Sequence, residues 1–305
     1  MSTKSLILGV GGQDGSFLAE ELLSRRHEVH GLYRRCSTTN LTRVSHILNK
    51  ITLHKGDLSD PLSLLSAVDA SQADCIYNMA DQDDVRWSGH VPSYNIDVTA
   101  GAVANLLEIT KRRKIRMFQP VSSTMFKPSL RPLDELSELK PNSVYACAKA
   151  CAYHLTRLYR SEGVFASTAI MFNHDSPRRG PGYLLQRICA DAKRVANGEL
   201  DAIDVGIPDT TVDIGYAKEY MVAVANIMEL NYTSDFVLGT GIGATILEIA
   251  QYALECLRVD SSKVSMAMAQ ASPWSIANST KARTFAGFNP HTTWRQLVPM
   301  ILGVE

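Results

Sequence analysis

The sequence has no long hydrophobic run and no excess of either charge. No apolar stretch approaches the ~20 residues needed to cross a bilayer, so we expect no membrane partner. The chain carries 31 basic and 31 acidic residues, which gives a formal net charge of zero and no bulk attraction to nucleic acid. Its 305 residues are enough for one large domain or two modest ones.

Cysteine is scarce, and its positions do not form a metal-binding pattern. The six cysteines are scattered through predicted strands and helices. Cys147 and Cys151 lie four residues apart, but no second Cys/His pair accompanies them, so helix packing is predicted rather than a metal site. The first residues lead straight into a strand-like segment, with no cleavable signal. We therefore expect a cytoplasmic protein.

A short apolar run leads into a glycine-rich turn. Residues 5–9 are typical of a central parallel strand that is buried on both faces, and an amphipathic helix follows the turn. In such a unit Gly9 permits the tight turn, Gly12 lets the backbone approach a pyrophosphate, and Gly15 allows close packing of the helix. The pattern predicts dinucleotide binding, with a structural glycine turn as the alternative. The predicted site comprises Gly9, Gly12, Gln13, Asp14 and Gly15.

The end of the second predicted strand bears on the choice of dinucleotide. An acidic residue at this point usually binds the ribose hydroxyls of NAD, but here the strand ends in Arg34 and Arg35, close to Ser37. Arginines suit a 2′-phosphate, so the sequence favours NADP over NAD; a solvated basic loop is the alternative. After the third strand, Asp57 is well placed to hydrogen-bond an adenine, with Leu58 against the ring.

Strand-like and helical segments alternate through the first half of the chain. This alternation predicts an α/β fold with a doubly wound parallel sheet of the Rossmann type. We expect a nucleotide-binding domain over residues 1–180 and a small substrate-binding lobe over residues 181–305. Segments near 205–220 and 235–240 are candidates for returning to the first domain. After the first two strands, further strands are predicted at residues 51–55, 75–79, 117–121, 165–171 and 235–238.

Tyr145 and Lys149 lie four residues apart and share one face of a predicted helix. An ammonium beside a phenol stabilises the phenolate, so the tyrosine is expected to exchange a proton near neutral pH. The spacing also occurs by chance on many helices. Downstream of a dinucleotide-binding unit, and with Ser122 placed to hydrogen-bond a substrate oxygen, it predicts the catalytic centre of an extended short-chain dehydrogenase.

Longer motifs make the relationship more specific. They lie at residues 9–15, 29–35, 56–60, 217–220 and 279–282, and the most distinctive is Phe-Asn-His-Asp-Ser-Pro-Arg-Arg-Gly at residues 172–180. Through these motifs most of the chain resembles the GDP-mannose 4,6-dehydratase family. The resemblance implies NADP, a nucleotide-sugar or nucleoside-like substrate, and a homodimer or homotetramer.

The resemblance also implies particular contacts. His174 has an alternative role, since a loop histidine can simply hydrogen-bond the backbone. The implied cofactor contacts are Arg34, Arg35, Asp57, Leu58, Met79, Ala80, Tyr94, Tyr145, Lys149, His174 and Arg179, and the implied substrate contacts are Asn173 and Arg187.

The chain departs from the family after the fifth strand, where a threonine and a glutamate normally act with the tyrosine. Ser122 replaces the threonine as a hydroxyl donor, Ser123 follows it, and Thr124 stands where the glutamate should be. A threonine cannot act as the carboxylate that removes water, a role worth about 10²–10⁴ in rate.

A second departure is an acidic loop after the fourth strand. The family has small or neutral residues here and then Ser-His, whereas this chain has Asp81, Asp83 and Asp84. Either the loop is simply solvated, or Asp83 or Asp84 supplies the missing base or faces a cationic or hydroxyl-rich substrate group.

A third departure concerns the diphosphate. Val212 replaces an arginine expected to pair with it, and a second arginine has no counterpart around residues 272–282. Other side chains then hold the diphosphate, or the substrate is less negative than GDP-mannose.

The sequence therefore predicts an NADP-dependent enzyme that transfers a hydride at a sugar carbinol. Epimerisation or reduction of a 4-keto sugar needs no glutamate at position 124 and is the first alternative. A cofactor-binding homologue without catalytic activity is the alternative from another class.

Overall fold

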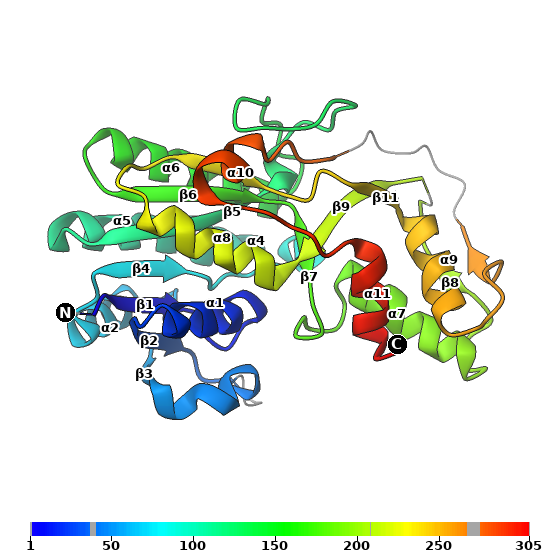
Figure 1. Ribbon diagram of the computed structural model, residues 1–305. Helices are drawn as coiled ribbons and strands as arrows, with labels where there is room; N and C mark the ends of the chain where they lie inside the picture. Colours follow the sequence, from blue (N-terminus) through cyan, green and yellow to red (C-terminus); the bar gives the residue numbers. More distant parts are fainter. Residues whose placement is uncertain (1, 37–40, 208, 267–274, 305) are drawn as a thin grey trace.

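The computed structural model describes residues 2–36, 41–207, 209–266 and 275–304, which are built around a seven-stranded parallel sheet (Figure 1). The predicted α/β fold with a doubly wound sheet is confirmed. The strand order is β10-β6-β5-β4-β1-β2-β3. The strands are β1 (Lys4–Leu8), β2 (Glu28–Tyr33), β3 (Ile51–Lys55), β4 (Cys75–Asn78), β5 (Arg116–Ser122), β6 (Ala166–Met171) and β10 (Asp235–Leu238).

Strand β1 is covered on both faces, as its continuous apolar sequence predicts. Leu6 and Leu8 belong to one hydrophobic core, whereas Ile7 belongs to the core on the opposite face. The helices therefore form two layers. Helices α1 (Gln13–Ser24) and α8 (Ala217–Glu229) cover the Ile7 face, and α2 (Pro61–Ser71), α5 (Ala102–Arg113) and α6 (Val144–Ser161) cover the other.

Helix α6 carries the predicted Tyr–Lys pair on its buried face. It begins after Ser143, whose side chain accepts a hydrogen bond from the backbone N–H of Ala146 at 3.1 Å. Alternate alanines favour the helix and let it lie close to β5. As a result Tyr145 and Lys149 are 7% and 5% exposed.

The helical segment between β4 and β5 is not continuous. It consists of α4 (Pro92–Ile96), a wider π-helical turn (Asp97–Gly101) and α5. Val98 and Thr99 in the wide turn are buried, and the Thr99 hydroxyl donates a hydrogen bond to Asp81. Turns of this kind often occur beside functional sites, and here the turn faces the loop that follows β4.

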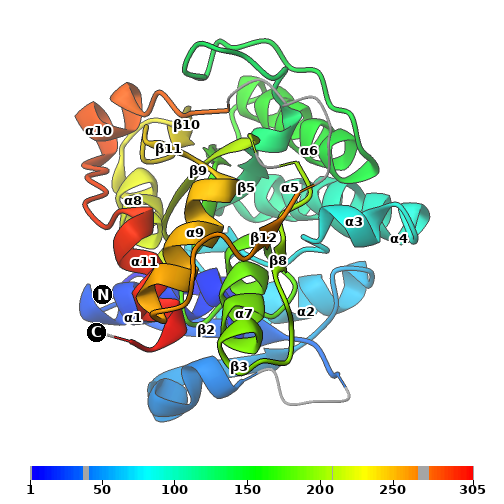
Figure 2. The same ribbon diagram turned by 90° about the vertical axis from the view of Figure 1, so that its right-hand side faces the viewer.

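The second half of the chain adds a smaller lobe with its own core (Figure 2). Strand β10 nevertheless lies in the large sheet, and α8 packs against α1; the division at residue 180 stays a prediction. The lobe contains the helices α7 (Leu184–Ala196), α9 (Ile246–Cys256) and α11 (Trp294–Leu302). One small sheet has the strand order β11 (Gly243–Thr245), β9 (Thr211–Tyr216) and β7 (Asn173–Asp175), and the other pairs β12 (Val264–Ser265) with β8 (Ile203–Asp204). The remaining elements are η1 (Thr42–Lys50), α3 (Val85–Ser88), η3 (Ser123–Met125) and α10 (Thr280–Ala286).

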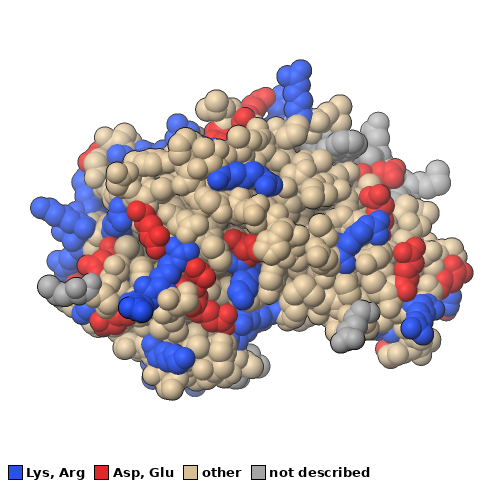
Figure 3. All heavy atoms as spheres, viewed as in Figure 1, with Lys and Arg blue, Asp and Glu red and all other residues tan. Residues whose placement is uncertain are grey.

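The surface matches the balanced charge of the sequence. Acidic and basic side chains are interspersed over the face shown in Figure 3. Within the described ranges, none of the helices combines the length and the apolar character that a membrane span requires.

An ion pair fastens the start of α1 to β7. The ring of His174 donates to the Phe172 carbonyl through Nδ1 at 2.8 Å and contacts Asp14 Oδ2 through Nε2 at 2.9 Å, so both nitrogens face acceptors. Burial alone would lower the pKa of His174, but the charge and hydrogen bond of Asp14 outweigh it and the pKa is raised. Burial would likewise raise the pKa of Asp14, yet His174 and Arg179 lower it. Both pKa shifts favour the ionised form of the pair.

We expect His174→Asn to lower the free energy of unfolding by about 2 kcal/mol at about pH 5.5 and by much less at about pH 9. The folded pKa of His174 lies above its ordinary value of 6.5, so its stabilisation is complete below that value. It is lost as pH rises through the folded pKa. Urea unfolding at both pH values measures the difference. The control is His46→Asn, since His46 is exposed beside Glu20; an equal loss from His174→Asn at both pH values would contradict the assignment.

Candidate active site

A cavity of about 620 Å³ lies at the carboxyl ends of the parallel strands, where α/β sheets usually bind ligands. It collects most of the predicted site residues, namely Gly9, Gly12, Gln13, Asp14, Arg34, Asp57, Leu58, Met79, Ala80, Asp83, Asp84, Tyr94, Ser122, Thr124, Tyr145, Lys149, Asn173, His174 and Arg179. Four other predicted residues are described but do not line it, namely Gly15, Arg35, Ser123 and Arg187. Ser37 lies outside the described residues.

The glycine turn brings backbone to one wall of the cavity. Gly9 has a φ of +77°, and a Cβ on it would lie 2.9 Å from Cα of Ala80. A Cβ on Gly15 would lie 2.3 Å from the Gly9 carbonyl oxygen, so α1 can pack here only because that residue is glycine. No side chain caps the start of α1 at Gly12, and its N-terminal N–H groups suit a phosphate.

Buried Asn78 adds a polar atom to the same wall. Its Nδ2 donates to Gln119 Oε1 at 2.9 Å, whereas its Oδ1 accepts no hydrogen bond within the part of the chain that the structure describes. A buried acceptor of this kind normally has a partner. The turn and this amide fit a bound dinucleotide.

Two arginines lie beside the glycine turn. Arg34 Nη1 donates to Tyr94 Oη at 3.2 Å. Arg43, on η1, donates to the carbonyls of Arg178 at 2.5 Å and Gly11 at 3.2 Å, and it lines the cavity. Sequence reasoning missed Arg43 because a single arginine beyond the Arg34–Arg35 pair belongs to no motif.

Tyr145, Lys149 and Ser122 meet at another part of the cavity. Lys149 Nζ lies 5.7 Å from the centre of the Tyr145 ring and donates to the Pro120 carbonyl at 3.3 Å. Ser122 lines the cavity with Tyr145 and lowers the pKa of its phenol. The Thr124 hydroxyl donates to Ser122 Oγ at 3.0 Å, so two linked hydroxyl groups lie in the same cavity as the phenol.

Asp81 is a residue of this centre for which the sequence suggested no individual role. Its Oδ2 lies 2.5 Å from Lys149 Nζ, and both side chains are nearly buried. Burial would lower the pKa of Lys149, but the charges of Asp81 and Tyr145 outweigh burial and raise it. The one feature of the sequence that could have identified Asp81 is its position three residues after Asn78, which ends β4.

The structure differs from the sequence-based expectation for the tyrosine. Burial, together with the charges of Asp81 and Asp83, raises the pKa of Tyr145, and the opposing effects of Lys149 and Ser122 are smaller. The ammonium alone would have favoured the phenolate, as predicted. Burial outweighs that effect, and the charge of Asp81 beside the ammonium offsets part of it.

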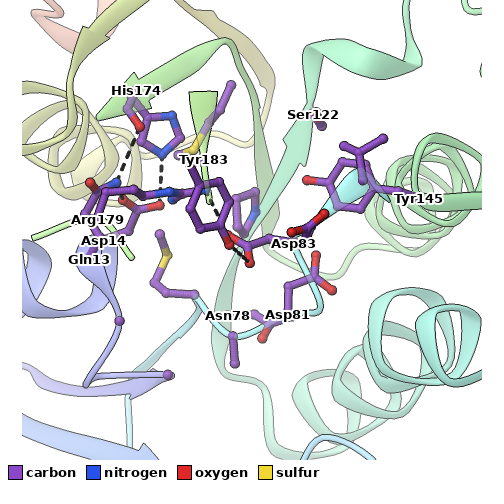
Figure 4. A pocket seen from close by; sticks show the side chains of 18 of the residues that line it. Gln13, Asp14, Asn78, Asp81, Asp83, Ser122, Tyr145, His174, Arg179 and Tyr183 are labelled. Carbon is purple, nitrogen blue, oxygen red and sulfur yellow. Dashed lines mark hydrogen bonds and ion pairs between the residues drawn. The ribbon is translucent and has the colours of Figure 1, made fainter. Parts of the chain in front are cut away.

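The other two acidic residues of the loop have different partners. Asp84 caps α3 by accepting from the backbone N–H groups of Arg86 at 2.9 Å and Trp87 at 3.0 Å. Asp83 accepts from Arg179 Nη2 at 3.0 Å and from Tyr183 Oη at 2.6 Å. We call this set (Asp83, Arg179 and Tyr183) the Asp83 clasp; it joins the loop after β4 to the segment before α7 (Figure 4).

The positions expected to hold a diphosphate are not strongly cationic. Val212 lies on β9, and the neighbouring Asp213 is buried and bound by Thr240 and backbone N–H groups. Residues 272–274 lie outside the described residues. The arginines that line the cavity, among the residues described, are Arg34, Arg43, Arg86 and Arg179.

Known proteins share this fold and much of the sequence. A solved dTDP-glucose 4,6-dehydratase from Bacillus anthracis, in complex with NAD, superposes with a TM-score of 0.86 at 17% identity over 99% of this chain and 96% of that chain. A Thermus thermophilus UDP-glucose 4-epimerase gives 0.83 at 21% identity over 98% and 97%. These structures share the fold of this chain.

Sequence relatives are closer. A GDP-mannose 4,6 dehydratase from Arabidopsis thaliana is 33% identical over 98% of this chain and 85% of its own length. A GDP-mannose 4,6-dehydratase from Yersinia enterocolitica is 36% identical over 81% and 70%. The family model for GDP-mannose 4,6 dehydratase matches residues 6–301. The resemblance inferred from the motifs is thus confirmed, and the chain belongs to the GDP-mannose 4,6-dehydratase family.

Proposed function

We propose that this protein is an NADP-dependent enzyme that transfers a hydride at a sugar carbon of a nucleotide sugar. The observation that carries the proposal is the convergence of Ser122, Tyr145 and Lys149 in the same cavity as the glycine turn. A site without catalytic activity has no physical need for all three side chains to meet, which argues against a homologue that only binds cofactor.

The chain's own residues suit the cofactor. The start of α1 would hold the diphosphate, Asp57 and Leu58 the adenine, and Arg34 with Arg43 a 2′-phosphate. When bound, NADP would accept or deliver the hydride. The family and the names of the relatives support a nucleotide-sugar substrate. A cytoplasmic location, which the scattered cysteines favour, and a homodimer or homotetramer, which the motif resemblance implies, remain part of the proposal.

The proton-transfer steps can be assigned to side chains that line the cavity. Ser122 would polarise the substrate oxygen, and Tyr145 would exchange a proton with it. Lys149 would stay protonated and place a positive charge beside the Tyr145 phenol. Thr124 supplies a hydroxyl to this chain, but it cannot take up a proton as a carboxylate does. Asp83 is already held by Arg179 and Tyr183, and Asp84 caps a helix.

These contacts favour a second candidate within the same chemistry. Epimerisation or reduction of a 4-keto sugar uses the hydride and the Tyr145 proton but needs no base for removing water. We propose that one of these replaces the complete 4,6-dehydration.

Replacing Tyr145 with phenylalanine removes the proton carrier and leaves the ring. We expect kcat/KM to fall by about 10²–10⁴ with the best nucleotide-sugar substrate, measured by the absorbance of the reduced nicotinamide. Tyr153→Phe is the matched control, since Tyr153 lies on the same helix and its hydroxyl contacts Asp235 instead. Full turnover by Tyr145→Phe would refute the assignment.

Incubation with GDP-mannose and NADP tests the missing base. We expect little 4-keto-6-deoxy product from the natural protein and at least about tenfold more from Thr124→Glu, because a carboxylate restores proton abstraction. Thr124→Gln, equal in size but without the charge, should not gain activity. Efficient elimination by the natural protein would show that another group serves as the base.

Removal of the Arg34 side chain tests the choice of cofactor. We expect Arg34→Ala to weaken NADP binding by about ten- to a hundredfold, the value of a charge-assisted contact with the 2′-phosphate. NAD binding, measured by the same calorimetric titration, should change little. Equal losses for both dinucleotides would place Arg34 away from the 2′-phosphate.

A further inference from the structure

Asp81 is the nearly buried carboxylate at the reaction centre that the mechanism above leaves without a role. Its Oδ2 lies 2.5 Å from Lys149 Nζ, and its side chain is 11% exposed. Asp81 belongs to the acidic loop after β4, where the sequence departs from the pattern that the resemblance leads us to expect. Figure 4 shows Asp81 and Tyr145 on the same side of the cavity.

The carboxylate is held in place by other contacts. Its Oδ1 accepts from the Thr99 hydroxyl and, at 2.8 Å, from the backbone N–H of Gln82. Gln82 is fixed in turn by Asn95, whose Nδ2 donates to Gln82 Oε1 at 2.7 Å and to its carbonyl at 3.0 Å. The wide helical turn that carries Thr99 and the short helix that carries Asn95 therefore both orient Asp81.

Lys149 is oriented by the same arrangement. Its ammonium contacts Asp81 on one side and donates to the Pro120 carbonyl at 3.3 Å on another. The carboxylate beside the ammonium therefore offsets part of the positive charge that faces Tyr145.

Tyr145 experiences the balance of all the charges that face it. Lys149 approaches from its own helix, Asp81 and Asp83 from the loop after β4, and the uncharged Ser122 from β5. Arg179 and Tyr183 lie behind Asp83 and bind its carboxylate. Burial and the two carboxylates together outweigh the ammonium, so the neutral phenol is favoured.

We propose that Asp81 is a positioning residue that acts through Lys149: it offsets part of the ammonium's charge and helps to keep Tyr145 protonated, as a proton donor for carbonyl reduction. The proposal rests on the function proposed above. In the reductive direction the carbonyl carbon gains a hydride from the reduced nicotinamide, and the carbonyl oxygen gains the Tyr145 proton. The products are the carbinol, the oxidised cofactor and a tyrosinate that water reprotonates.

Titration of Tyr145 tests the proposal without any substrate. The protein is labelled with ¹³Cζ-tyrosine, and the Tyr145 signal is identified by its loss in Tyr145→Phe. In Asp81→Asn we expect the tyrosine to titrate about one pH unit lower, because Asp83 is then the remaining carboxylate named above that opposes the ammonium. Asp81→Ala, which restores a small residue of the kind the family has, should give a shift in the same direction.

Asp84→Asn is the matched control, since it removes the same charge from the same loop while its carboxylate faces the start of α3. Its Tyr145 titration should stay within about 0.3 pH units of the natural protein. Asp81→Glu, which keeps the charge, should move the titration less than Asp81→Asn. An unchanged titration in folded Asp81→Asn and Asp81→Ala would overturn the proposal.

Activity gives an independent readout. With a 4-keto sugar nucleotide and NADPH, the alkaline limb of kcat/KM should move to lower pH by about one unit in Asp81→Asn. With the carbinol and NADP, the acidic limb should move the same way and raise oxidation at low pH. A natural protein without turnover on any nucleotide sugar would refute the proposed function, whereas the tyrosine titration would still decide the role of Asp81.

Discussion

The close packing of α1 against the turn after β1 determines where the cavity and its chemistry lie. Without a side chain at Gly15, the helix contacts the Gly9 carbonyl directly, and Gly9 in turn contacts Ala80 after β4. Asp81 follows Ala80 and binds Lys149 on α6. The dinucleotide end and the proton-transfer end are thus joined by a continuous series of backbone and side-chain contacts, and a bulkier residue at either glycine would displace both.

The sequence predicted those parts of the molecule that depend on local patterns. Strand-like segments of the sequence located all seven strands of the large sheet, and the clearest are short apolar runs such as β1, because a strand buried on both faces needs continuous hydrophobic sequence. The spacing of Tyr145 and Lys149 placed them on one helix face, and the end of β5 placed Ser122 opposite them. The family followed from motifs that the relatives share.

The remaining features are contacts between distant residues, which no local pattern records. Lys149 and its partner Asp81 lie 68 positions apart, as their residue numbers show, and Asp83 lies 96 positions from Arg179. Burial is the main cause of the raised Tyr145 pKa, and the charges of Asp81 and Asp83 add to it, so an argument from Lys149 alone gave the opposite direction. The wide turn at Asp97–Gly101 was also missed, since helical propensity does not distinguish it from an ordinary helix.

The Asp83 clasp gives the cavity an internal competitor for anions. Arg179 already binds a carboxylate at 3.0 Å and lies 3.7 Å from the centre of the Tyr183 ring. A phosphate that takes this arginine must exchange with Asp83, so the free energy gained is the difference between two charge-assisted pairs. An anionic ligand is then selected by how well it replaces Asp83 as the partner of Arg179. A neutral or weakly charged group that leaves the clasp intact binds without the cost of breaking the Asp83–Arg179 pair.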